Sequence, residues 1–216
     1  MGRIHWKSTA RRDELMVKEF ELDPKAEVWI FLDMDDTVQA AMPIPVSQTT
    51  AQFLIESEKI MLIPSTVEYA ISITASIARY YLGRGRAVGL VSSAPGTDNL
   101  SPDKGESHLE KILAFLALLE TESDLPLPVL LAREAQQIPR GSTVVVVTPT
   151  VDPQIALNLD QMVRLGLHPV VILLDAESFG GAAGVEQMFQ TIKSMHIPVC
   201  KVENAKDLGQ SLSEWG

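Results

Sequence analysis

Cysteine is almost absent from this 216-residue sequence, which contains only Cys200. A single thiol can form neither an internal disulfide nor a metal site built from several cysteines. Because Cys200 lies in an apolar run near the C-terminus, we expect it to be buried and chemically inert. Disulfide-stapled and zinc-ribbon folds are therefore excluded for this chain.

Long apolar segments are also missing. No run approaches the ~20 consecutive apolar residues that a transmembrane helix needs, and no basic and then apolar signal sequence opens the chain. With 46% hydrophobic residues the sequence can nevertheless bury a full core. We therefore expect the chain itself to be soluble and to fold around one core.

Positive charge is scarce and unevenly placed. The sequence has 18 Lys and Arg against 28 Asp and Glu, a formal net charge of −10. Residues 1–18 hold five basic and two acidic residues, so this leader is net +3 and the remainder is −13. An acidic body argues against nucleic acid as a partner, because phosphate binding needs a basic surface.

Apolar runs alternate with amphipathic segments along the chain. The runs at 28–32, 87–92, 143–148 and 169–175 have no polar face, which is typical of parallel strands covered on both sides. The pattern predicts an α/β fold with a doubly wound, mostly parallel sheet in a Rossmann-type three-layer sandwich. We expect one domain over 27–216, ending in a helix at 205–215, after a basic leader and edge segment over 1–26.

Helix starts have recognisable spacings. Asp152 followed by Pro153 predicts one N-terminus, with Asp152 as the cap. In the first turn of a helix that would start near residue 107, we expect His108 to be exposed. Two Ser-x-x-Glu spacings predict capping boxes: Ser65 with Glu68, and Ser107 with Glu110.

Three carboxylates and a hydroxyl follow the first strand, in the order Asp33-Met34-Asp35-Asp36-Thr37. Functional groups in open α/β sheets lie beyond the carboxyl ends of the strands, so this is the first place to look for a site. The spacing resembles two family motifs. One is the first motif of haloacid-dehalogenase-type phosphatases; the other is a decayed Asp-x-Ser-x-Ser, the metal-ion-dependent adhesion site (MIDAS) of von Willebrand factor A domains.

The phosphatase resemblance implies Asp33 as nucleophile and Asp35 as general acid/base beside Mg²⁺. Such an enzyme also needs a hydroxyl after the second strand, for which Ser92 or Ser93 is available, and an acidic pair after a later strand. The strand ending at Thr148 is followed by Asp152 alone. The phosphatase therefore remains the alternative, and we expect no enzymatic activity.

The adhesion-site resemblance implies Asp33 as the first ligand, with Asp35 in place of a Ser and Thr37 in place of the second Ser. The third loop should supply an Asp, but the sequence has Thr148-Pro149-Thr150 there. The site is therefore expected to be degenerate. Asp33, Asp35 and Thr37 remain weak candidates for metal ligands, and we expect no firmly bound cofactor beyond weak Mg²⁺.

A longer resemblance covers the N-terminal region. The run Arg3-Ile4-His5-Trp6-Lys7-Ser8-Thr9-Ala10-Arg11, followed by Leu15-Met16-Val17-Lys18-Glu19-Phe20-Glu21, resembles the signature of the bacterial domain of unknown function 58 (DUF58) family. In that family the signature precedes a von Willebrand A-like domain, which commonly has a short antiparallel edge strand, here near Leu100. The resemblance implies a membrane-anchored protein with two membrane-spanning helices upstream, which presents this domain to the cytoplasm.

The resemblance further implies a scaffold or adaptor that works with a MoxR-type AAA+ ATPase, so the expected function is protein interaction without catalysis. The 38–64 loop lies after the first strand and is a candidate lid. An alternative partner surface is the leader around Arg11 and Arg12. The expected interaction surface comprises this loop and six residues: Asp33, Asp35, Asp36, Thr37, Thr148 and Thr150.

Overall fold

The structure is a computed structural model that describes residues 26–43, 63–94, 99–119, 121 and 125–204. Three predicted segments lie outside the described residues: the leader and edge segment up to residue 25, positions 44–62 of the proposed lid, and the helix at 205–215. The division into 1–26 and 27–216 therefore stays a prediction.

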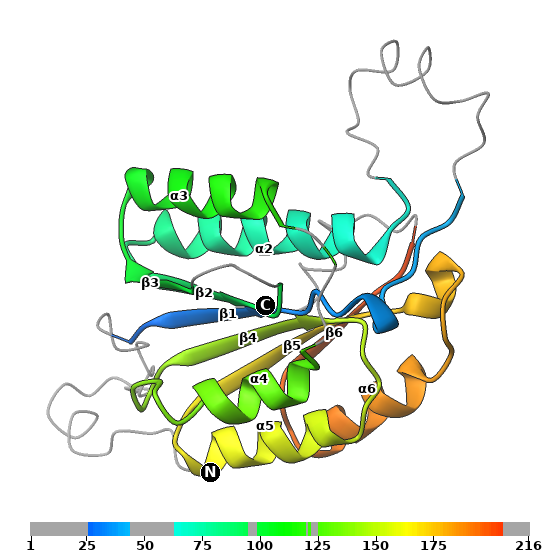
Figure 1. Cartoon of the computed structure of the whole chain (residues 1–216). Helices are drawn as coiled ribbons and strands as arrows, with labels where there is room; N and C mark the ends of the chain where they lie inside the picture. Colours follow the sequence, from blue (N-terminus) through cyan, green and yellow to red (C-terminus); the bar gives the residue numbers. More distant parts are fainter. Residues whose placement is uncertain (1–25, 44–62, 95–98, 120, 122–124, 205–216) are drawn as a thin grey trace, which may run out of the picture.

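The described residues form one six-stranded sheet in the order β3-β2-β1-β4-β5-β6 (Figure 1). All neighbouring strands are parallel except β3, which runs antiparallel to β2 at the edge. This confirms the predicted doubly wound sheet with one short antiparallel edge strand. The strands are β1 (Val28–Leu32), β2 (Val88–Ser92), β3 (Leu100–Asp103), β4 (Thr143–Thr148), β5 (His168–Leu174) and β6 (Val199–Val202).

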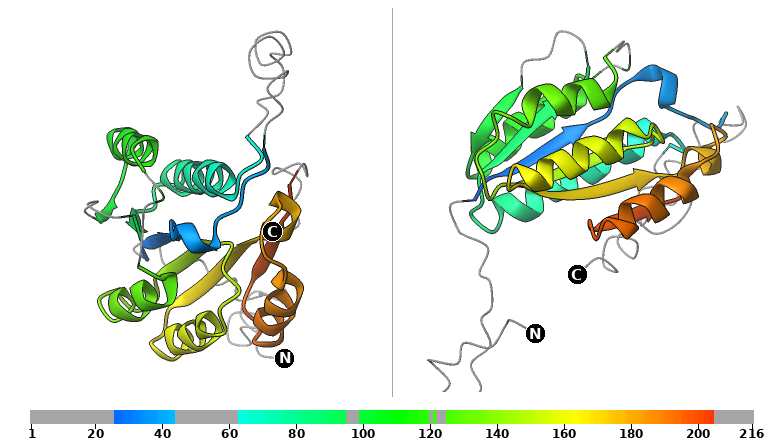
Figure 2. Two further views of the ribbon diagram at one scale, coloured as in Figure 1. Left: turned by 45° about the vertical axis from the view of Figure 1, so that its right-hand side comes forward. Right: turned by 90° about the horizontal axis from the view of Figure 1, so that it is seen from below.

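Helices cover both faces of the sheet, as Figures 1 and 2 show. One face carries α2 (Thr66–Leu82) and α3 (Glu106–Ala117). The other carries α4 (Leu127–Glu134), α5 (Gln154–Arg164) and α6 (Val185–Ser194). Two 3₁₀ turns, η1 (Asp36–Val38) and η3 (Ala176–Phe179), follow β1 and β5. The site loops therefore connect central strands to helices at one end of the sheet.

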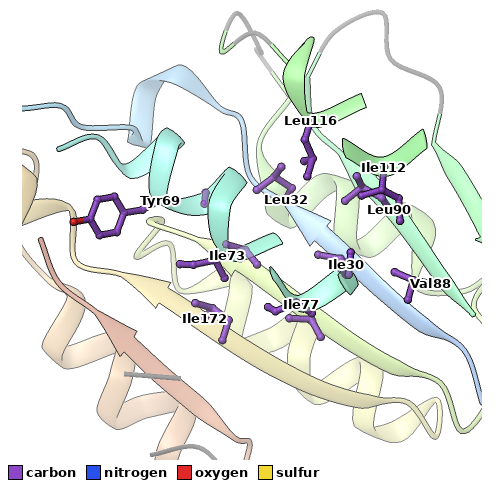
Figure 3. Close-up of a cluster of buried hydrophobic side chains, with 14 of the residues drawn as sticks. Ile30, Leu32, Tyr69, Ile73, Ile77, Val88, Leu90, Ile112, Leu116 and Ile172 are labelled. Carbon is purple, nitrogen blue, oxygen red and sulfur yellow. The ribbon is translucent and has the colours of Figure 1, made fainter. Parts of the chain in front are cut away.

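Side chains alternate between two separate cores. Val145 and Val147 of β4 face α2, whereas Val144 and Val146 face α4 and α5. Because both faces of a central strand are buried, its interior positions are apolar and polar side chains occur only at its ends, which explains the runs without a polar face. Figure 3 shows the core under α2 and α3, where Ile73 lies among the buried side chains of the sheet.

The start of α3 differs from the prediction. Gly105 occupies the cap position and the helix begins at Glu106, so Ser107 does not form a capping box. His108 is buried, with Nε2 2.7 Å from the carbonyl oxygen of Val88, and the expectation of an exposed His108 was wrong. It lies four residues before the buried Ile112, and this helical spacing places it on the face toward the sheet.

The other two helix starts agree better with the sequence. Ser65 is the cap residue of α2, as its position predicted, but its side chain makes no capping hydrogen bond, so the predicted capping box with Glu68 was wrong. At α5 the carboxylate of Asp152 accepts a hydrogen bond of 2.8 Å from the amide of Gln154, which satisfies a free N–H of the first turn.

Two sequence expectations concern the membrane and the thiol. Cys200 is buried in β6, as predicted. Among the described helices, none is both long enough and apolar enough to cross a bilayer.

Replacing Ile73 with Ala should destabilise the domain by about 2–5 kcal/mol, because the side chain is fully buried and its removal leaves a cavity. The measurement is urea unfolding followed by circular dichroism. Ser76→Ala, at an exposed position of the same helix, is the matched control and should change the free energy of unfolding by about 0.5 kcal/mol or less. Equal destabilisation by both substitutions would contradict the assigned packing of α2.

Candidate functional site

Asp33 joins the ends of the two central strands. Its side chain is fully buried immediately after β1. One carboxylate oxygen, Oδ2, accepts a hydrogen bond of 2.5 Å from the hydroxyl of Thr148, the last residue of β4. The hydroxyl oxygen of Thr148 in turn accepts from the amide of Thr150 at 2.9 Å. The predicted interaction surface included residues of both loops, and we expected these loops to meet because the central strands before them should be neighbours in a doubly wound sheet. The structure brings the two loops into direct contact.

Asp35 organises the turn that follows. Its Oδ1 accepts hydrogen bonds from the amide of Thr37 at 3.0 Å and from the hydroxyl of Thr37 at 2.7 Å. Asp35 is buried, and its side chain caps the start of η1. The amide of Asp35 donates to Oδ1 of Asp33 at 3.2 Å, so the two carboxylates are linked through the backbone.

Two serines lie at the end of β2, and the second of them, Ser93, holds the loop after β1 from the other side. Ser93 Oγ accepts a hydrogen bond of 2.7 Å from the amide of Met34, and the amide of Ser93 donates to the carbonyl of Leu32 at 3.2 Å. Ser92 Oγ accepts from the amide of Ala94 at 3.1 Å. The phosphatase reading gave Ser92 or Ser93 a phosphate-binding hydroxyl, whereas both hydroxyls here satisfy backbone amides.

Three polar residues at this end of the sheet were missed by the sequence analysis. Gln39 donates from Nε2 to the carbonyl of Asp33 at 2.9 Å, and its Oε1 accepts from the hydroxyl of Thr66 at 2.7 Å, which ties the loop to α2. Asp175 follows β5, and its Oδ1 is buried without a hydrogen bond within the described part of the chain. A carboxyl directly after a predicted strand was a usable signal for Asp175, but no spacing rule identifies Gln39 or Thr66.

Burial controls the ionisation of Asp33. Removal of the carboxyl from water raises its pKa to about 6 from the ordinary 3.8. The hydrogen bonds from Thr148 and from the amide of Asp35 act in the opposite direction, and the negative charge of Asp35 adds to the increase. Because Asp33 has no cation beside it among the described residues, hydrogen bonds alone compensate its charge.

The six predicted surface residues differ in exposure. Asp36 and Thr37 are exposed, but Asp33, Asp35, Thr148 and Thr150 are buried. A partner that docks on this end of the domain can touch the first two directly, whereas the other four shape the loops beneath. The interaction surface itself stays a prediction.

The oxygens of the candidate metal ligands are already engaged. Both carboxylate oxygens of Asp33 accept hydrogen bonds, and Oδ1 of Asp35 accepts two from Thr37. Within the described residues no group of three or more His, Cys, Asp or Glu side chains is arranged to hold a metal ion. A divalent ion wants about six oxygen ligands, so this arrangement does not fit one.

Solved structures with the same arrangement of elements include two from Bacteroides. BatB of Bacteroides thetaiotaomicron has a TM-score of 0.53 and 16% sequence identity, over 88% of this chain and 98% of that one. An aerotolerance-related membrane protein of Bacteroides fragilis has a TM-score of 0.53 and 15% identity over the same shares. The fold is of the von Willebrand A type.

A third neighbour carries a metal in its adhesion site. Proximal thread matrix protein 1 of the mussel byssus, solved with a zinc-occupied MIDAS motif, has a TM-score of 0.52 and 11% identity over 88% of this chain and 46% of that one. No protein-family model matches the chain, and no curated protein matches its sequence. At these identities the neighbours establish the fold, and membership of the DUF58 family stays a prediction.

Replacing Asp33 with Asn should change how stability depends on pH. In the unfolded chain the Asp33 pKa returns to about 3.9, while the folded pKa is about 6. Well below pH 4 both states hold the proton. Between about pH 4 and pH 6 the unfolded chain releases the proton that the folded state keeps, so the free energy of unfolding falls by up to about 3 kcal/mol and then stays level. Asn mimics the protonated side chain and lacks this loss.

The measurement is urea unfolding of both proteins at several pH values. Relative to Asp33→Asn, the native protein should lose stability between about pH 4 and pH 7. Asp160→Asn, at a surface ion pair with Arg164, is the control and should show little of this dependence. Parallel stability curves for the native protein and Asp33→Asn would show that Asp33 titrates normally.

Proposed function

We propose that this chain is a non-catalytic protein-interaction domain built on a degenerate MIDAS. The observation that carries the proposal is the hydrogen bond between Asp33 and Thr148. In the adhesion site that the sequence resembles, the third loop supplies a carboxylate to a bound cation. In this chain a hydroxyl at that position bonds directly to the first carboxylate, so the two loops are joined without an ion.

The burial of Asp33 supports this role over the phosphatase alternative. A nucleophilic aspartate must reach the phosphorus atom of its substrate in line with the leaving group. Asp33 is fully buried, with Thr148 against one carboxylate oxygen and the amide of Asp35 against the other. Asp35 is committed to capping the turn at Thr37, which leaves it poorly placed as a general acid/base.

The surface at this end of the sheet favours a partner with positive charge. Asp36, Asp152 and Glu177 are exposed, and they follow β1, β4 and β5 respectively, so acidic side chains surround the buried loops. Charge complementarity of this kind mainly raises association rates and selects partners. Asp36 and Thr37 are the predicted interface residues that a partner can contact first.

The cellular setting follows from two kinds of resemblance. The N-terminal signature resembles the DUF58 family, and similar structures include BatB and an aerotolerance-related membrane protein. The printed names of these neighbours are consistent with a domain of a bacterial membrane protein, and the DUF58 resemblance adds the expectation that the domain acts on the cytoplasmic side. A MoxR-type AAA+ ATPase is the partner that the family resemblance implies, and this domain would act as its scaffold or adaptor.

Divalent metal should bind weakly. With the oxygens of Asp33 and Asp35 engaged, we expect calorimetry to show Mg²⁺ and Mn²⁺ affinity no tighter than about millimolar, because a cation must break existing hydrogen bonds. Thr148→Asp, which restores a carboxylate to the third loop, should increase the affinity. Micromolar binding by the native protein would contradict the degenerate site.

Partner binding should depend on the acidic end of the sheet. We expect Asp36→Lys with Glu177→Lys to weaken binding of a MoxR-type ATPase from the same organism by about tenfold or more, measured by interferometry. Glu106→Lys with Glu110→Lys is the matched control, since both acids are exposed in the first turns of α3. Arg11→Glu with Arg12→Glu tests the leader. Loss of binding only in that last variant would move the interface to the leader.

A further inference from the structure

A cavity of about 230 Å³ lies between the C-terminal end of α4 and the strands β1 and β3. Trp29 is the second residue of β1, whereas Asp33 follows the last residue, so the cavity lies toward the opposite end of the strand from the site described above. Its lining residues are Trp29, Asn99, Ser101, Glu134, Gln137 and Ile138.

The indole of Trp29 forms a fixed wall of this cavity. Its Nε1 donates a hydrogen bond of 2.9 Å to the carboxylate of Glu27. On the neighbouring strand, Gly89 has no side chain, and a Cβ placed there would lie 2.9 Å from Cε3 of Trp29 and 3.0 Å from Cγ of Pro102. Gly89 thus lets the indole lie across β2 toward β3. Both contacts hold the ring in one orientation before any ligand arrives.

Polar groups converge on the cavity with hydrogen-bonding capacity to spare. Asn99, Ser101 and Gln137 are exposed, and their side chains make no hydrogen bond with any residue in the part of the chain that the structure describes. Two amides and a hydroxyl can both donate and accept. These three side chains therefore suit a ligand whose own polar groups both donate and accept hydrogen bonds.

The carboxylate in the cavity belongs to Glu134 and forms an ion pair with Arg133. Glu134 has only 16% of its side chain exposed, and its Oε1 accepts a hydrogen bond of 2.8 Å from Nε of Arg133. Arg133 balances the negative charge of Glu134. The cavity therefore has no net charge that would strongly attract an anion or a cation such as an ammonium group. The second carboxylate oxygen remains available as an acceptor.

We propose that this cavity binds one ring of a neutral saccharide. The hydroxyls of a sugar both donate and accept, which matches Asn99, Ser101, Gln137 and Glu134, while its C–H face is apolar and packs on an aromatic ring. Ile138 supplies a further apolar wall and is buried. The cavity is smaller than the roughly 300–1,000 Å³ of pockets for larger ligands, so it holds a single ring.

The inference is tested with the full chain and two sugars, glucose and N-acetylglucosamine, by saturation-transfer NMR and amide shift titration. We expect binding of at least one sugar, and a dissociation constant raised about tenfold or more by Gln137→Ala and by Trp29→Leu. Gln161→Ala, at an exposed position of α5 away from the cavity, is the matched control and should leave binding unchanged.

Three results would overturn the assignment. These are no saturation transfer to either sugar, sugar binding that both cavity variants retain, and choline binding tighter than either sugar, which would indicate a cation site instead. Circular dichroism and thermal unfolding establish that each variant is folded. Because Gln137 is exposed, Gln137→Ala should fold normally even if Trp29→Leu does not.

Discussion

A buried carboxylate that bonds to a neighbouring strand is the constraint on which this end of the domain depends. Asp33 cannot remain ionised away from water unless donors surround it, and Thr148 and the amide of Asp35 supply them. The side-chain contact thus extends beyond the strand ends the pairing of β1 with β4, in which the amide of Asp33 also donates to the carbonyl of Val147. Asp35, Ser93 and Gln39 then fix the backbone around Asp33, so the carboxylate and its loop are mutually dependent.

The proposed exchange of a cation for a hydroxyl would change what such a site can do. A metal-dependent adhesion site can take an acidic group of its partner as a further ligand of the ion, so its affinity follows the ion. With Asp33 bonded to Thr148, the loops have no such open ligand position, and the exposed groups nearby are themselves acidic. Under the proposed function, the fold would keep the position of an interface while the partner carries the opposite charge.

Much of the fold, but less of the site, follows from the sequence. Runs such as Val144 to Val147 are apolar because both faces of β4 are covered, and that pattern is local and readable. Proximity of Asp33 and Thr148 follows from the adjacency of central strands, so topology predicted it. The contact of Gln39 with Asp33 depends on the path of a loop, which local periodicity does not encode. The spacing of His108 to Ile112 does place it on the buried face of α3, but the hydrogen bond to Val88 depends on how the helix packs on the sheet.

The order of strands in space has a consequence for synthesis on the ribosome. β1 is the first strand of the described chain, yet one of its two neighbours, β4, ends at Thr148. Until that segment has emerged, β1 can pair only with β2, so one edge of an apolar strand stays open and the carboxyl group of Asp33 lacks its hydroxyl donor. An exposed apolar strand edge of this kind is prone to aggregation, so the separation of β1 and β4 in sequence delays the burial of this edge during folding.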